Sequence, residues 1–83
     1  MTDKTLHISI LAPDGPLHEG EARAVFLPGT LSPFEVLPGH APIISALSAG
    51  QIRVVAEEEL SFSIRGGVVK VRDNAITACV ETA

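Results

Sequence analysis

Apolar and polar residues alternate one by one along most of this chain, and that alternation is the feature that most restricts its fold. Leu6, Ile8 and Ile10 share one phase, and His7 and Ser9 stand between them. Successive side chains of a β-strand point to opposite faces, so a period of two predicts a strand with one buried face. A helical period is almost absent. The chain is therefore expected to be all-β.

Glycine, proline, asparagine and aspartate interrupt the alternating runs at short intervals. Turns are predicted at 12–15, at Pro28-Gly29 and at Asp73-Asn74, because these residues supply the backbone angles of tight turns. Strands are expected over 6–10, 17–20, 22–27, 34–37, 43–47, 51–56, 59–65, 68–72 and 76–80. About eight to ten short strands at this spacing predict a single domain over residues 1–83, a small antiparallel β-sandwich or flattened barrel.

Two details of the pattern make specific expectations. Glu57-Glu58 should form the tip of a hairpin whose second strand turns Leu60, Phe62 and Ile64 inward. Gly66-Gly67 should either turn the chain into the next strand or mark a close approach of two backbones.

Composition excludes several classes of function. The net charge of −4 and the absence of Trp and Tyr leave neither a basic surface nor a base-stacking platform, so nucleic-acid binding is not expected. The single cysteine, Cys79, allows no internal disulfide and favours a reducing compartment. Met1-Thr2-Asp3-Lys4 lacks the apolar stretch of a signal peptide, and no apolar run approaches the ~20 residues that span a bilayer. A soluble, cytoplasmic protein is expected.

No constellation of catalytic or metal-binding residues stands out. His7, His18 and His40 are not at metal-ligand spacing, and Cys79 is interpreted as a small packing residue of the last strand. The acidic run 57–59 is interpreted as a solvated turn, and the flanking acids Glu19 and Glu21 as exposed. The glycine pair 66–67 is followed by no Gly-Lys-Ser/Thr, so it is not a phosphate loop. The sequence therefore predicts no catalytic, cofactor-binding or metal-binding residues, and the protein is not expected to be an enzyme.

The segment Val36-Leu37-Pro38-Gly39-His40-Ala41-Pro42 stands apart from the strands. Proline has no N–H to donate to a sheet, and glycine reaches backbone angles that strain other residues, so a rigid, shaped loop is predicted. Such a loop in so small a domain favours a docking surface. His40 either braces the loop through a nearby carbonyl or contacts a partner, and residue type alone leaves both possibilities open.

Several motifs occur in a fixed order along the chain. They are Leu27-Pro28-Gly29-Thr30, Val36 to Pro42, Leu47 with Gly50, Arg53-Val54, Ile64 with Gly66 to Val71, Ile76-Thr77-Ala78 and Glu81-Thr82-Ala83. In this order they resemble the N-terminal β-sandwich of the epsilon subunit of F-type ATP synthase, called delta in mitochondria. The resemblance covers about Leu6 to Ala83.

The resemblance implies a non-catalytic rotor subunit at the foot of the central stalk, without a cofactor. Such a subunit binds the gamma subunit, rests on the c-ring and helps couple proton transport to ATP synthesis. It is held at the cytoplasmic face of the bacterial inner membrane, peripherally, through the complex. By their place in the family pattern, Ala12, His40 and Ser45 would face gamma. The residues that would face the c-ring are Gly29, Thr30, Leu31, Ser32 and Pro33.

Two departures from the family pattern modify these expectations. The family reads Gly-Glu-Leu/Phe-Gly where this chain has Ser32-Pro33-Phe34-Glu35. Either Glu35 supplies the usual negative charge, or the contact with the ring is more apolar. The chain also stops at Ala83, where family members continue into a helical hairpin. The expectation is a short form without the C-terminal helical domain and its inhibitory role.

A different class of function is a free-standing ligand-binding sandwich with the His40 loop at the mouth of a pocket. It requires convergent polar groups in a concave site, and the candidates are His40, Ser45 and Arg53. The rotor hypothesis instead requires one apolar face that is too extensive for a soluble monomer.

Overall fold

The computed structural model describes residues 4–83, which form eight β-strands. Their bounds are β1 (Leu6–Ala12), β2 (Gly15–Ala22), β3 (Ala24–Leu27), β4 (Phe34–Val36), β5 (Ile43–Leu47), β6 (Gly50–Val55), β7 (Glu59–Arg72) and β8 (Ala75–Thr82). Among these residues no helix is long and apolar enough to cross a membrane. Met1, Thr2 and Asp3, part of the argument against a signal peptide, lie outside the described residues.

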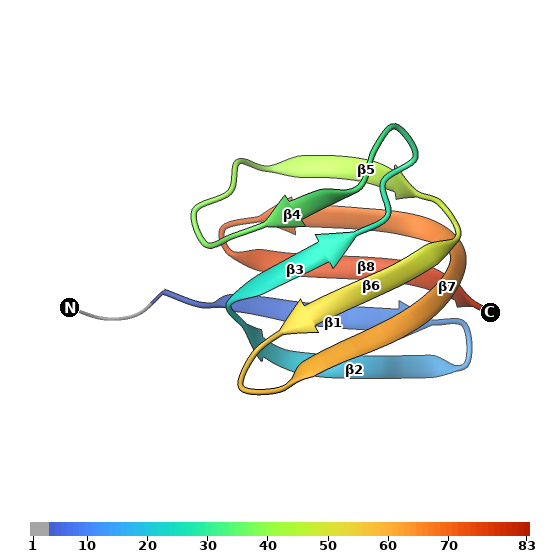
Figure 1. Cartoon of the computed structure of the whole chain (residues 1–83), viewed down its shortest axis with the longest axis horizontal. Coiled ribbons are helices and arrows are strands. Elements are labelled where there is room, and N and C mark those ends of the chain that lie inside the picture. Colours follow the sequence, from blue (N-terminus) through green and yellow to red (C-terminus); the bar gives the residue numbers. More distant parts are fainter. Residues whose placement is uncertain (1–3) are drawn as a thin grey trace.

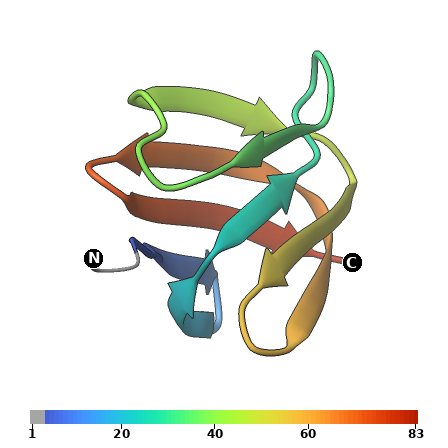
Figure 2. The same ribbon diagram turned by 60° about the vertical axis from the view of Figure 1, so that its left-hand side comes forward.

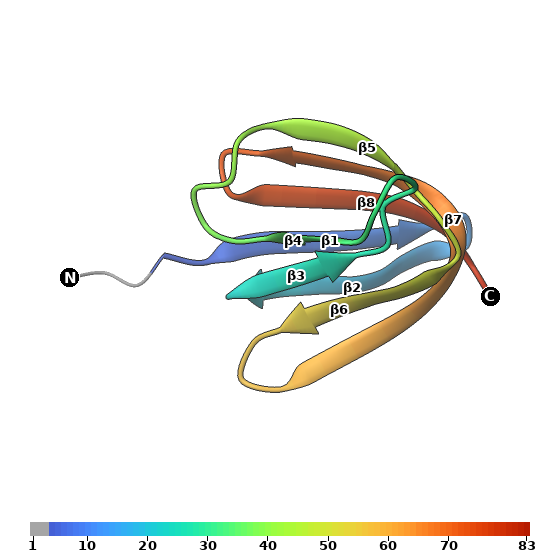
Figure 3. The ribbon, with the colours of Figure 1, turned by 45° about the horizontal axis from the view of Figure 1, so that its top comes forward.

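The strands are arranged in two layers that share β7 (Figures 1 and 3). Hydrogen bonding follows the order β2-β1-β8-β7-β6-β3-β4, with β5 added to β7. The first half of β7 pairs with β6, and its second half pairs with β5 and β8. One layer therefore holds β2, β1, β8, β5 and the end of β7, and the other holds the start of β7 with β6, β3 and β4. The predicted β-sandwich is confirmed.

One pairing differs from the expected antiparallel arrangement. β1 and β8 run parallel, with His7 opposite Ala75 and Leu11 opposite Cys79. Parallel neighbours cannot be joined by a tight hairpin, and these two lie at opposite ends of the sequence. Figure 2 shows the first and last strands side by side.

The space between the layers is filled by aliphatic side chains, as the alternation predicts. Every second residue of β1 and β8 is fully or almost fully buried, and no polar or charged side chain is buried among residues 4–83. The buried cluster comprises Leu6, Ile8, Ile10, Ala22, Val25, Leu27, Val36, Leu47, Ile52, Val54, Ile64, Val69, Val71, Ile76, Ala78 and Val80. The outward residues of the same strands remain available for a partner.

The glycine pair in β7 does not turn the chain into a new strand. β7 runs unbroken through 14 residues, so the expected turn at Gly66-Gly67 is wrong. The register shifts between Ile64 and Gly66, where the strand passes from one layer to the other. A Cβ at Gly67 would overlap the carbonyl oxygen of Cys79 and lie 2.9 Å from Cα of Val80. The alternative expectation, a close approach of two backbones, is therefore confirmed.

Three local details can be compared with the sequence. β2 continues past Gly20 to Ala22, so the predicted break is misplaced by a few residues. Leu60 is 37% exposed and lies near the start of β7. Of the three residues expected to point inward, Phe62 is half-buried and Ile64 is buried. The predicted turn between β7 and β8 is confirmed, since Asp73 (φ 51°) and Asn74 (φ 62°) both have left-handed backbones.

Candidate partner-binding surface

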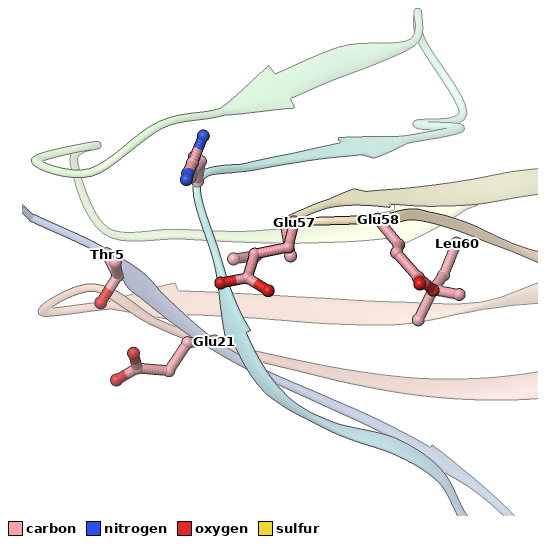
Figure 4. Close-up of a pocket in the computed structure, with 8 residues that line it drawn as sticks. Thr5, Glu21, Glu57, Glu58 and Leu60 are labelled. Atoms are coloured by element: carbon pink, nitrogen blue, oxygen red, sulfur yellow. The ribbon is translucent and has the colours of Figure 1, made fainter.

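Three of the acidic residues singled out in the sequence line a shallow hollow at one end of the sandwich. Figure 4 shows Glu21, Glu57 and Glu58 around it, with Thr5 and Leu60. All three carboxylates are exposed, and Glu57-Glu58 forms the β6–β7 turn, as expected for a solvated hairpin tip. In the described part of the chain no group of three His, Cys, Asp or Glu side chains could hold a metal ion.

The proline-bounded loop between β4 and β5 is held by hydrogen bonds to its own backbone and to a distant turn. His40 Nδ1 lies 2.7 Å from the carbonyl oxygen of Ala41, and its backbone N–H donates to Leu37. The N–H of Gly39 donates to Oδ1 of Asn74 at 2.7 Å. Within the chain, His40 therefore makes the contacts expected of a residue that braces the loop.

The residues expected to face gamma are distributed over one layer. Ala12 ends β1 at one end of the layer, whereas the His40 loop lies against the β7–β8 turn at the other end. Ser45 is half-buried in β5 opposite buried Val69, and its hydroxyl donates to the carbonyl oxygen of Ala46. A single partner could contact Ala12 and His40 only by covering the layer from corner to corner.

The residues expected to face the c-ring form an anchored loop with an exposed tip. Gly29 is buried and bridged to Leu47, and the N–H of Thr30 donates to Ala46 at 3.2 Å. Leu31 is fully exposed, and Ser32 and Pro33 are also exposed. Glu35 lies outside this tip, in β4 opposite Phe26. The tip carries no charged side chain, and the nature of the contact with the ring stays a prediction.

A row of apolar side chains crosses the outer face of the layer that contains β1, β8, β7 and β5. The strand registers place Leu11 opposite Cys79, Cys79 opposite Val68, and Val68 opposite Ala46. All four are exposed, Leu11 by 37% and Val68 by 49%. These four residues are called the apolar row below. Ile44, 75% exposed, extends the apolar surface along β5.

The apolar row corrects one sequence interpretation and reveals residues that the sequence reasoning missed. Cys79 is exposed and does not pack in the core. Each member of the row breaks the alternation of apolar and polar residues, because an apolar residue occupies an outward position beside an inward apolar one. Examples are Ile10-Leu11, Val68-Val69 and Ala78-Cys79. Those doublets are the sequence signal for apolar side chains on an outer face.

The ligand-binding alternative finds no common site. Arg53 lies on β6, stacks over the ring of Phe26 at 4.6 Å and binds Glu59 at 3.2 Å. His40 and Ser45 make their contacts elsewhere, and none of the four hollows found among the described residues is lined by any of the three. The polar groups that this hypothesis needs do not converge.

Comparison with known proteins identifies the family. The model of the ATP synthase delta/epsilon chain β-sandwich domain matches residues 5–83. The chain belongs to this family.

Relatives in this family are curated as ATP synthase epsilon chains. That of Synechococcus elongatus is 39% identical over 80 residues, and that of Bordetella parapertussis is 33% identical over 81 residues. In both cases the match covers 95% of this chain and 58% of the relative. The chain therefore spans somewhat more than half the length of these epsilon chains.

Chains in solved structures of ATP synthases share this fold. A chain of the Euglena gracilis mitochondrial enzyme, solved with its c-ring, matches with a TM-score of 0.87 at 18% identity, over 94% of this chain and 51% of that one. A chain of the Tetrahymena thermophila central stalk and c-ring matches with a TM-score of 0.79 at 13% identity, over 98% and 66%. At these identities the likeness concerns the fold.

Proposed function

We propose that this protein is a non-catalytic subunit of the central stalk of an F-type ATP synthase. It docks on the gamma subunit and the c-ring and helps couple proton transport to ATP synthesis. Its place is peripheral, at the cytoplasmic face of a bacterial inner membrane, where the complex holds it. Family membership supports this assignment, because the curated relatives are ATP synthase epsilon chains.

The observation that carries the proposal is the apolar row on the outer face of the sandwich. Burying apolar surface is the main favourable term in protein association, at about 25 cal/mol per Å². Contiguous apolar patches on a soluble protein mark interaction sites. The row lies on a rigid sheet and is supported from beneath by a fully aliphatic core. We assign the gamma subunit to this face.

The residues assigned to gamma are placed differently relative to this face. Ala12 adjoins Leu11 at one end of the apolar row, and both line a shallow hollow together with Val68 and Cys79. Ser45 lies between the outward Ile44 and Ala46 on β5, but its half-buried side chain is on the opposite side of the sheet, beside Val69, so a partner on this face reaches its backbone. His40 is reached by a partner that continues past Ile44 and Pro42 to the opposite corner.

The c-ring is assigned to the exposed tip formed by Leu31, Ser32 and Pro33, which Gly29 and Thr30 tie to β5. The tip belongs to the β3–β4 connection, which lies beside the end of β5 (Figure 1). Its fully exposed leucine favours an apolar contact.

Association with gamma tests the proposal. The chain and the gamma subunit of the same synthase, mixed at micromolar concentration, should co-elute in size exclusion. Val68→Ser should weaken the complex about tenfold. The substitution removes apolar surface that the complex would bury, which contributes about 1–2 kcal/mol to the free energy of binding. Leu60→Ser is the matched control, because Leu60 is an exposed apolar residue of the same strand in the other layer. Separate elution of the wild-type proteins would contradict the proposed function.

A further inference from the structure

Opposite charges occupy the two sides of the outer face that carries the apolar row. The strand registers place Glu19 opposite Ser9 and Glu21 opposite His7, on the side of β2. On β7, Lys70 and Arg72 alternate with buried Val69 and Val71, so both cations point outward. Three strand spacings of about 4.8 Å separate the acidic side from the basic side.

Between these charges the face carries no carboxylate, lysine or arginine. Across β1 and β8 the registers connect the two sides through Ser9 and Thr77 in one row and through His7 and Ala75 in the next. His7 lies 3.1 Å from Glu19, and Arg72 lies 3.6 Å from Asp73. No ion pair found among the described residues includes Glu21 or Lys70. Each side therefore keeps a charge that is free to meet a partner.

Apolar attraction cannot by itself orient a partner on this face. Hydrophobic burial is non-directional, and the apolar row presents similar small and branched side chains along its length. Charges fix the register of an interface, because a like-charge juxtaposition costs several kcal/mol. The two charged sides supply the directional element that the row lacks.

We propose that this charge polarity sets the orientation of the partner, which carries carboxylates over Lys70 and Arg72 and cations over Glu19 and Glu21, beside the apolar surface that covers the row. The inference rests on the proposed function and adds to it the chemistry of the gamma surface. Ile44 and Pro42, which line a hollow together with the two cations, provide apolar support for the acidic side of the partner.

A reversed-polarity variant tests the proposal without changing the apolar row. Glu19→Lys and Glu21→Lys are combined with Lys70→Glu and Arg72→Glu, so the net charge remains −4. Binding to the gamma subunit of the same synthase is measured by calorimetry at low and high salt. Affinity should fall at least about tenfold at low salt. The difference should shrink at about 1 M salt, where the screening length is near 3 Å.

Neutral variants separate position from charge. Lys70→Gln with Arg72→Gln should weaken binding, whereas Lys4→Gln with Arg23→Gln should not. The control pair has the same residue types and is also exposed, but it lies before β1 and between β2 and β3, outside the strands that carry the two cations and the apolar row. Thermal unfolding followed by circular dichroism should agree among all variants, since substitutions of exposed residues usually change stability little.

Three results would overturn the inference. Wild-type affinity in the reversed variant would show that the charges do not orient the partner, while the proposed function would stand. Equal losses in both neutral pairs would assign the effect to net charge. A chain that dimerises through this face, and dissociates when the polarity is reversed, would make a second copy the occupant.

Discussion

Asn74 connects three segments that are distant in the sequence. Its backbone lies in the left-handed region, its carbonyl oxygen accepts from the N–H of His7 at 2.8 Å, and its side chain accepts from Gly39. Asparagine tolerates left-handed geometry better than most residues and has a short acceptor. One side chain therefore links the rigid loop to the β7–β8 turn.

Replacement of Asn74 separates its two roles. Asn74→Gly keeps the turn geometry and removes the acceptor, so the free energy of unfolding in urea should fall by about 1 kcal/mol. Hydrogen exchange of the Gly39 amide should become faster at the same time. Asn74→Asp retains the acceptor and should leave the exchange near the wild-type rate. If Gly39 is unaffected by the glycine variant, the side chain does not hold the loop.

The sequence predicts the turn at Asp73-Asn74 but not the contact that Asn74 makes. The turn is local, and its backbone angles are a property of these two residue types. The hydrogen bond from Gly39 crosses 35 residues of chain, so it depends on how β5 and β8 are placed against β7. Local chemistry is visible in the sequence, whereas contacts between elements require the topology.

At the scale of the elements, β7 joins the two layers and Gly67 permits the bend. Gly67→Ala would force a methyl group against the backbone of β8, which cannot move aside without breaking its pairing. We expect a loss of about 2–3 kcal/mol, typical of overpacking. Gly66→Ala is the matched control, because its nearest neighbour is 3.4 Å away and the cost should stay below about 1 kcal/mol. Chemical denaturation of both variants gives the comparison, and equal costs would contradict the close-approach argument.

The elements themselves were largely predictable, and their pairing was not. The 43–47 strand matches β5, and the predicted strands at 6–10 and 76–80 lie within β1 and β8. Alternation says which residues face inward, but it says nothing about which strands are neighbours. The parallel pairing of β1 with β8 and the continuity of β7 arise from long-range packing. A glycine pair predicts a break or a close approach equally well, and only the neighbouring strand decides between them.

At the scale of the whole molecule, the apolar row exists only because the sheet brings four distant residues side by side. Leu11, Ala46, Val68 and Cys79 come from four different strands, and each taken alone is an ordinary exposed apolar residue. Pairs of adjacent apolar residues in the sequence indicate that one of the two points outward. The order of the strands decides whether these outward residues lie next to one another. The rotor hypothesis requires an exposed apolar face, and the structure contains an apolar row that the sequence alone could not locate. The binding of gamma through Ala12, His40 and Ser45 stays a prediction.

Cys79 provides a direct probe of that face, because it is the single cysteine of the chain and lies within the apolar row. Thiol modification depends on exposure. Alkylation by N-ethylmaleimide, followed by mass spectrometry, should be at least about tenfold slower in the complex with gamma than in the free chain. Chain alkylated beforehand should assemble poorly, since the added group stands between Leu11 and Val68.

A Cys79→Ser, Ser61→Cys variant moves the thiol to an exposed position of β7 in the other layer and should react equally in both states. If Cys79 reacts at the same rate in the free chain and in a stable complex, gamma covers a different surface and the assignment of this face is wrong.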